Sequence, residues 1–423
     1  PYQGYLSENC TTIAEVMRGA GYHTLMTGKW HLGADRKECW PLQRGFDFYF
    51  GGISGAFNYF QPGGNRGITR GNEPVTTDSS FYSTDTFTDE ACQYLSLIAQ
   101  QDDRPFFLYL AYNAPHWPLN AKWEDYQKYR GRYKSGWDAL MKQRLAKQVE
   151  LGIFSSDVAP APHTGRYWND LSAEQQDDMD SIMAAYAGCI DSIDQNIGKL
   201  VAHLKSLERF DNTLIFFLSD NGACQEGGML GKGNEAMVKD PPLGTTDGVR
   251  LGEAWAIACN TPLRKYKHFL HEGGARTPLI AHWPQGIADS LDGGFIDQHA
   301  YLPDFMATCL AVSGATYPEN LPACEGQSLL PALAGSNEPV HSEPIYFEHE
   351  GNAAMMWQKW KLVREYQKPW ELYKLENDPA ELVNLAKDHA EQTSKMVKMW
   401  ETWAKERQVA YPSRFNMYEH IAK

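Results

Sequence analysis

The sequence predicts an α/β protein: a mostly parallel central sheet sandwiched by helices over residues 1–340, then a small antiparallel sheet and a helix over residues 341–423. Two observations predict the larger part. Continuous apolar runs, which are typical of strands buried on both faces, alternate with segments of helical periodicity. A third observation concerns the smaller part, where the pattern changes near residue 340 to short strand-like runs separated by turn signals.

The elements of the larger part each have a local signal. Thr11 or Thr12 can cap a helix over residues 11–20, with Glu15 in its first turn and Gly21 after its end. The apolar runs predict strands at residues 23–27, 105–112, 212–222 and 277–284. Helical periodicity predicts further helices at residues 173–207 and 300–313.

The C-terminal part and two long loops complete the predicted organisation. The runs IYFEHE, AAMMWQ, WKLVRE and WELYKL predict short antiparallel strands, and residues 388–406 predict a final helix. Residues 61–83 and 222–253 carry little regular pattern, and the second stretch is rich in glycine. Because loops over an α/β sheet often carry function, we expect these two to shape a substrate site.

Composition excludes some function classes. The chain has 423 residues, a formal net charge of −14 and 43% hydrophobic residues, which fits a globular protein and argues against nucleic-acid binding. No apolar run approaches the roughly 20 residues of a membrane span. The eight cysteines are dispersed without a CxxC pair, which favours buried free thiols. An anionic substrate would therefore need a local concentration of positive charge.

The sequence LSDNG contains a candidate metal site. Asp220 and Asn221 directly follow an apolar strand, and ligands of open α/β sheets bind beyond the carboxyl ends of strands. A carboxylate and an amide oxygen suit a hard cation such as Ca²⁺ or Mg²⁺, although two oxygens are too few alone. The alternative is a plain Asp-Asn-Gly turn.

Two further segments offer histidine and lysine at strand ends. In GYHTLMTGKWHLG, an extended backbone would point Lys29 and His31 the same way, which suits holding an anion and moving a proton. In NAPHWPL, His116 lies between two prolines after a predicted strand and is a candidate general acid. The alternatives are a solvated surface turn for the first pair and a packed loop histidine for the second.

A basic cluster lies in NTPLRKYKHFLHEGGARTPLIAHWP. Its cationic side chains precede a Gly-Gly break and a buried strand, and they are Arg264, Lys265, Lys267, His268 and His271. In an acidic protein this is the best candidate for an anion site, with a solvated helix face as the alternative. Taken together, the candidate residues suit transfer of a tetrahedral oxyanion group, sulfuryl or phosphoryl.

The sequence resembles the sulfatase family, within the alkaline-phosphatase-like superfamily and nearest to its bacterial arylsulfatase branch. GYHTLMTGKWHLG is similar to the family's second signature. The segments that follow in the family's order are QRGFDFYFGG, FLYLAYNAPHWP, YAGCIDSIDQNIGKL, FLSDNG, YKHFLHEGGARTPLIAHWP, GQSLLPAL and FEHEGNAA. The resemblance covers nearly the whole chain and implies a calcium-dependent sulfuric ester hydrolase.

The resemblance also implies a role for each matching residue. Lys29 would contact the sulfate and the nucleophile, and His31 would hold the hydrated nucleophile and act as base. His116 would be the acid beside the leaving oxygen, and Lys267 would neutralise the sulfate ester near it. Asp220 and Asn221 would be two of the ligands of Ca²⁺, with Mg²⁺ as the alternative.

The sequence departs from the family in its nucleophile. The family uses a cysteine or serine in C-x-P-x-R, oxidised to formylglycine and lying upstream of the second signature, and the 423 residues contain no such motif. Cys39 begins C-W-P-L-Q-R, whose arginine is one residue too far away, so we do not expect it to be the nucleophile. Residues 352–354 are Asn-Ala-Ala where the family has an arginine. Because Pro1 begins the sequence, the resemblance implies an N-terminally truncated chain.

Three hypotheses follow. The first is a sulfuric ester hydrolase for an aryl or carbohydrate sulfate, inactive as this chain because the nucleophile is missing. The second is a phosphonate or phosphodiester hydrolase of the same superfamily, since the lysines and the cation suit either group. The third is a non-catalytic protein that binds a sulfated ligand. If the strand that the family has before its second signature is missing, the chain should expose sheet surface and be marginally stable. Localisation and oligomeric state are not assigned.

Overall fold

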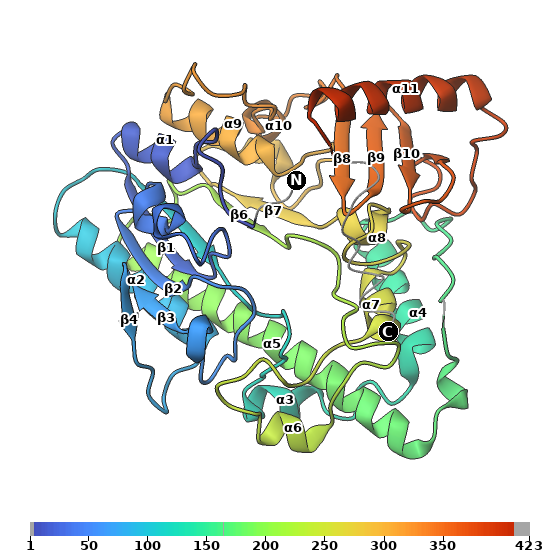
Figure 1. The fold of residues 1–423 in the computed structure, drawn as a ribbon, viewed down its shortest axis with the longest axis horizontal. Coiled ribbons are helices and arrows are strands. Elements are labelled where there is room, and N and C mark those ends of the chain that lie inside the picture. The colour runs from blue at the N-terminus through green and yellow to red at the C-terminus, as the bar shows by residue number, and fades with distance from the viewer. Residues whose placement is uncertain (1–3, 164, 410–423) are drawn as a thin grey trace.

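The computed structural model describes residues 4–163 and 165–409. Its central sheet has five strands in the order β4-β3-β2-β1-β5 (Figure 1). The strands are β1 (His23–Gly28), β2 (Phe48–Gly52), β3 (Ile68–Arg70), β4 (Glu73–Val75) and β5 (Phe106–Ala111). β1 runs parallel to β2 and β5, whereas β3 and β4 are antiparallel strands at one edge. The predicted α/β class, with parallel strands at the sheet's centre, is confirmed.

Helices surround this sheet, and two of them begin with a capping box. The Thr12 side chain accepts from the Glu15 N–H while the Glu15 side chain accepts from the Thr12 N–H, as the predicted helix start required. Ser172 and Gln175 repeat the arrangement at the start of α5. The α-helices are α1 (Ile13–Gly19), α2 (Ser83–Ala99), α3 (Trp123–Tyr129), α4 (Gly136–Glu150), α5 (Ala173–Ser206), α6 (Glu235–Lys239), α7 (Glu253–Asn260), α8 (Glu272–Ala275), α9 (Pro303–Ser313), α10 (Leu330–Leu333) and α11 (Ala390–Glu406).

β1 is buried along its whole length. Leu25 packs in one hydrophobic cluster with Phe87 of α2, and the next residue, Met26, packs in another with Ala14 of α1. Because successive strand residues point to opposite faces, helices cover both faces of the sheet at β1. This arrangement is the physical reason for the continuous apolar run in the sequence.

β6 (Ile215–Leu218) and β7 (Leu279–His282) correct one expectation. Rather than joining the parallel sheet, they pair antiparallel with each other in a sheet of two strands. An apolar run identifies a strand, but its direction and partner depend on how the intervening chain returns, which the run does not encode. Phe217 and Ile280 are 44% and 59% exposed, so this sheet also presents apolar surface.

The C-terminal part is a four-stranded antiparallel sheet in the order β11-β10-β9-β8, and α11 packs against it (Figure 1). Its strands are β8 (Ile345–His349), β9 (Asn352–Trp357), β10 (Trp360–Arg364) and β11 (Glu371–Lys374). Met355 and Leu362 of the sheet bury against Met396 and Trp400 of α11. The predicted antiparallel sheet and helix are confirmed, while residues 410–423 of the proposed C-terminal part lie outside the described residues.

Buried charge joins the C-terminal sheet to the α/β body. Lys361 of β10 is 1% exposed, and its Nζ lies 2.6 Å from Glu272 Oε1 of α8 and 3.0 Å from Glu381 Oε1. Glu381 also accepts from the Glu272 N–H. Burying an ammonium and two carboxylates costs desolvation free energy, which only close, well-oriented contacts repay. These contacts therefore hold the start of α8 against β10.

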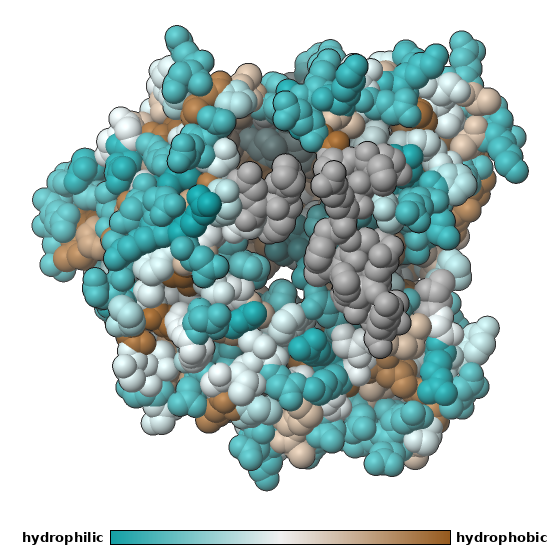
Figure 2. Space-filling model, in the orientation of Figure 1, coloured by the Kyte–Doolittle hydropathy of each residue, from teal (hydrophilic) through white to brown (hydrophobic). Residues whose placement is uncertain are grey.

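The surface agrees with the acidic, polar composition. Figure 2 shows one face that is largely hydrophilic, with hydrophobic residues in scattered patches. Within residues 4–163 and 165–409, no helix combines the length and the hydropathy needed to cross a membrane.

Candidate active site

Lys29 and His31 follow the end of β1, where the backbone is tied to both neighbouring strands. The Lys29 N–H donates to the Ala111 carbonyl at 2.8 Å, and the His31 N–H donates to the Ile53 carbonyl at 2.9 Å. A Cβ at Gly28 would lie 2.0 Å from the Ala111 carbonyl oxygen, so this approach requires glycine. The expected extended backbone is wrong, because His31 has a left-handed φ of 59°.

His116 lies in the loop after β5 and has a defined tautomer. Its Nδ1 lies 2.8 Å from the Trp117 carbonyl oxygen, which can only accept, so Nδ1 carries the proton. The neutral ring therefore presents the lone pair of Nε2, and the Lys267 Nζ donates to it at 3.4 Å. Burial and then the Lys267 charge lower the pKa of His116 to about 4.

Lys267 is positioned by close backbone packing between the SDNG and HEGG segments. Its N–H donates to the Ala223 carbonyl at 3.1 Å, and the Gly222 N–H donates to the Gly274 carbonyl at 2.9 Å. A Cβ at Gly222 would lie 1.8 Å from the Gly273 carbonyl oxygen. The glycines of SDNG and HEGG thus let the turn after β6 lie directly against the segment that carries the lysine.

Asp220 and Asn221 form the turn at the end of β6. Asp220 is exposed, and its charge partly offsets the lowering of the Lys29 pKa by burial and by Lys267, so the carboxylate lies within electrostatic reach of that ammonium. The Asn221 Nδ2 donates to the Gly222 carbonyl at 2.9 Å, which leaves its carbonyl oxygen as the free acceptor of the amide. One carboxylate and one amide oxygen fit Ca²⁺, but they supply only part of a shell of about six to eight oxygens.

The candidate residues converge electrostatically. Burial lowers the pKa of Lys29, and the nearby charges of Lys267 and Arg66 lower it further. Partial removal from water, then Lys29, Arg66 and Lys267, likewise lower the pKa of His31. The charges of Lys29, Lys267 and Arg66 therefore act on the same groups, and an anion bound among them would relieve their mutual repulsion.

Sequence reasoning missed Arg66 and Glu226, both in the long loops expected to shape a site. Arg66 donates to the Ala56 carbonyl at 2.5 Å. Glu226 accepts from the Trp117 Nε1 at 2.5 Å and lies 3.4 Å from the Lys267 Nζ. Although burial opposes it, His268, Lys267, His116 and Trp117 together hold the pKa of Glu226 at about 2. Loop position was the available signal, since neither residue lies in a recognisable motif.

The basic residues of the cluster at 264–271 do not all contact the same groups. Arg264 and His271 pair with Glu371 of β11, and Lys265 pairs with Glu365. The expectation of one basic anion site is therefore too broad, because these side chains have carboxylate partners in the C-terminal part. Lys267 is the cation of the cluster that interacts with His116.

Cys39 is buried and packs against the segment that follows β1. Its thiol lies 3.6 Å from the Leu6 carbonyl oxygen, and its own carbonyl accepts from the Trp30 Nε1. That Cys39 is not the nucleophile stays a prediction.

The fold and this cation-rich region define a protein of the alkaline-phosphatase-like class. The chain belongs to the sulfatase family. The family model described as Sulfatase matches residues 1–315. A second family model, described as the C-terminal region of N-sulphoglucosamine sulphohydrolase, matches residues 265–408.

Individual relatives agree with this assignment. An uncharacterized sulfatase of Schizosaccharomyces pombe is 31% identical over 96% of this chain and 78% of its own length. The arylsulfatase of Klebsiella aerogenes is 33% identical over 67% of this chain and 64% of its own length. The crystal structure of Ps i-CgsB, also solved in complex with k-i-k-neocarrahexaose, is 28% identical with a TM-score of 0.66, and the match covers 93% of this chain and 73% of that one.

Proposed function

We propose that the chain is the core of a sulfuric ester hydrolase that cleaves an aryl or carbohydrate sulfate ester. The observation that carries the proposal is the contact of Lys267 with a neutral His116, with Lys29 within electrostatic reach of both and Arg66 within reach of Lys29 and His31. Such a group neutralises the charge of a sulfuryl group in transfer. The similarity to an arylsulfatase and to a protein solved with an oligosaccharide supports both substrate classes.

His116 would deliver a proton to the leaving oxygen. With a pKa of about 4 it is neutral at pH 7 and must first gain a proton. An anion held between Lys29 and Lys267 offsets both ammonium charges and raises that pKa, so that Nε2 can take up and transfer the proton. Lys267, which donates to the same nitrogen, would move to the ester oxygen when substrate enters.

His31 would act as the base. Burial and then the surrounding cations lower its pKa, so the imidazole is neutral and can accept a proton near neutral pH. The nucleophile it serves would be the hydrated aldehyde of a formylglycine, which the family forms from C-x-P-x-R. Since the 423 residues contain no such motif, we expect this chain alone to hydrolyse sulfate esters poorly or not at all.

Asp220 and Asn221 would hold part of a Ca²⁺ site, with Mg²⁺ as the alternative. A cation there would supply positive charge to the oxygens of the transferred group. Because the two residues leave most of a coordination shell to other ligands, we expect Ca²⁺ to bind weakly to this chain. Tight binding in calorimetry would contradict that expectation.

Sulfate binding tests the site without needing turnover. Isothermal titration of 4-nitrophenyl sulfate should show binding by the wild-type chain and at least about tenfold weaker binding by Lys29→Ala and Lys267→Ala, since charge-assisted hydrogen bonds are lost. Lys142→Ala, on the exposed side of α4, is the matched control. Equal affinity in all four proteins would show that the anion binds elsewhere.

Substrate comparison separates the remaining hypotheses. Joined to a segment that carries C-x-P-x-R, the protein should turn over aryl sulfate faster than aryl phosphodiester or phosphonate. The reverse order favours the phosphonate or phosphodiester hydrolase. Binding without turnover of either favours the non-catalytic protein.

A further inference from the structure

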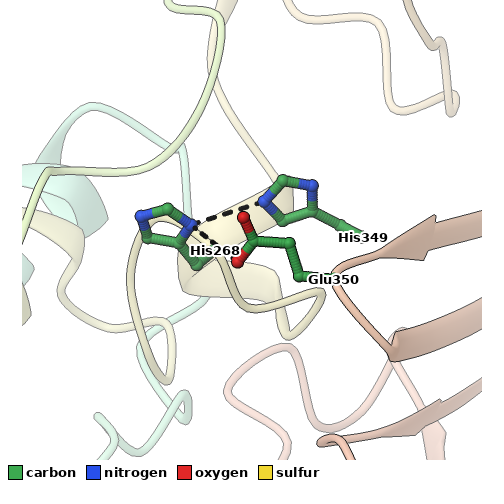
Figure 3. Close-up of side chains that lie close together, drawn as sticks. All are labelled: His268, His349 and Glu350. Atoms are coloured by element: carbon green, nitrogen blue, oxygen red, sulfur yellow. Dashed lines mark hydrogen bonds and ion pairs between the residues drawn. The ribbon is translucent and has the colours of Figure 1, made fainter. Parts of the chain in front are cut away.

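A second cluster of potential ligands lies beside the candidate active site. It consists of His268, from the segment between α7 and α8, with His349 at the end of β8 and Glu350 in the following turn (Figure 3). Figure 3 shows the three side chains directed toward one another from two different parts of the chain. Residues more than 80 positions apart are thus brought to one point.

The distances suit a metal ion of the zinc class. His349 Nε2 lies 3.4 Å from His268 Nδ1, which lies 3.7 Å from a carboxylate oxygen of Glu350. The potential ligand atoms all lie within 4.8 Å of one another. Ligands at about 2.0–2.1 Å from a tetrahedral Zn²⁺ are separated by roughly 3.3 Å, so the two separations from His268 Nδ1 are already close to those of a zinc site, and a side-chain adjustment of His349 or Glu350 would complete the triangle.

The backbone and the carboxylate both indicate a constrained site. His268 and Glu350 have left-handed φ values of 80° and 52°, which are uncommon for residues with a side chain and concentrate at functional positions. The Glu350 Oε2 is buried and has no hydrogen-bond partner among the described residues. A buried carboxylate oxygen facing imidazole nitrogens is costly unless a cation lies between them.

Glu226 provides the second layer of such a site. One of its carboxylate oxygens lies 3.7 Å from His268 Nε2, the ring nitrogen on the far side from His349. Metal-bound histidines commonly donate their other N–H to a carboxylate, which fixes the tautomer and leaves the opposite nitrogen as the ligand. The same Glu226 contacts Lys267, so this cluster adjoins the candidate active site.

We propose that His268, His349 and Glu350 bind one divalent transition-metal ion of the zinc class. Two imidazoles and one carboxylate select Zn²⁺ or Co²⁺ over Ca²⁺, which prefers oxygen ligands, so this site differs from the one proposed at Asp220 and Asn221. Three protein ligands leave a fourth position open to water or substrate. The ion would tie the segment that carries Lys267 to the C-terminal sheet.

Metal titration tests the proposal and needs no catalytic activity, so it stands or falls separately from the proposed function. The chain, stripped of metal by a chelator, is titrated with Co²⁺ while its visible ligand-field absorption is recorded. We expect one Co²⁺ per chain with the strong absorption of a four-coordinate site, displaced by Zn²⁺ but not by Ca²⁺.

Matched variants assign the ion to these residues. His349→Ala and Glu350→Gln should each weaken Zn²⁺ binding by at least about tenfold, and Glu226→Gln by about 10–100-fold through the second layer. His203→Ala on α5 and Asp220→Ala should leave Zn²⁺ affinity unchanged. Circular dichroism checks that each variant is folded, and Glu350→Gln preserves side-chain volume.

Two results would overturn the proposal. One is a folded wild-type chain that binds neither Co²⁺ nor Zn²⁺. The other is binding that His349→Ala and Glu350→Gln leave unchanged, or that Asp220→Ala abolishes, since the ion would then lie at other ligands.

Discussion

The Nζ of Lys267 lies 3.4 Å from the Nε2 of His116, although 151 residues separate the two in the sequence. The contact links the loop after β5 to the segment before α8. Because an ammonium cannot accept a hydrogen bond, this geometry requires an unprotonated Nε2, and the Lys267 charge adds to burial in lowering the pKa of His116.

The first prediction concerns this pair. Lys267→Met removes the neighbouring charge, so the pKa of His116 should rise from about 4 toward the ordinary value of 6.5, with burial keeping the rise incomplete. The ring resonances of His116 in an NMR pH titration measure it. Lys142→Met should leave the titration unchanged, and an unshifted His116 in Lys267→Met would disprove the coupling.

The second prediction concerns the buried ammonium of Lys361. Lys361→Ala leaves Glu272 and Glu381 buried without their cation, which should lower the free energy of unfolding by about 3–5 kcal/mol. Urea unfolding followed by circular dichroism gives the value. The exposed Lys359 supplies the control, since Lys359→Ala should change it by less than about 0.5 kcal/mol. A similar small loss in both variants would contradict the structure.

The third prediction contrasts two glycines. At Gly222 an added Cβ would lie 1.8 Å from the Gly273 carbonyl oxygen, so Gly222→Ala should destabilise the chain and weaken binding of 4-nitrophenyl sulfate. At Gly198, in α5, an added Cβ meets nothing within 4 Å, so Gly198→Ala should stabilise by about 0.5–1 kcal/mol. Thermal unfolding of the two variants measures opposite shifts; shifts of the same sign would refute the packing argument.

The fourth prediction concerns acid stability at Glu371. Although burial opposes it, hydrogen bonds from His271 and Tyr373 and the charge of Arg264 lower the pKa of Glu371 from 4.5 to about 2. A depressed folded-state pKa gives stability that is complete above about pH 4.5 and is lost as the pH falls toward 2.

Glu371→Gln should therefore flatten the fall of unfolding free energy between about pH 4.5 and pH 2. Urea unfolding at a series of pH values detects the change, and the exposed Glu376→Gln serves as the control. An unchanged slope in Glu371→Gln would mean that other carboxylates carry the acid sensitivity.

The sequence predicted those parts of the fold that local pattern determines. The capped start of α1, the length of α5 and the buried run of β1 all follow from propensity and periodicity. The antiparallel pairing of β6 with β7 did not follow, because strand direction depends on contacts made by residues far apart.

The candidate site shows the same division. Lys29, His31, His116 and Lys267 could be proposed from the sequence because each lies at a strand end or in a motif, and their roles stay predictions. Arg66 and Glu226 could not, because they lie in irregular loops whose paths are set by tertiary packing. The extended backbone expected at His31 was wrong as well: the residue has a left-handed φ, and its N–H donates to Ile53 directly after β2, a contact that local pattern does not encode.

Because Lys361 is buried against Glu272, the α/β body and the C-terminal part cannot be exchanged between relatives independently of each other. A chimera that took its C-terminal part from a relative with an apolar residue at this position would leave Glu272 of the α/β body buried without its cation. A chimera of two relatives should therefore fold when Lys361, Glu272 and Glu381 all come from the same parent. The overlap of the two family matches at residues 265–315 falls across α8, where one of those glutamates begins the helix.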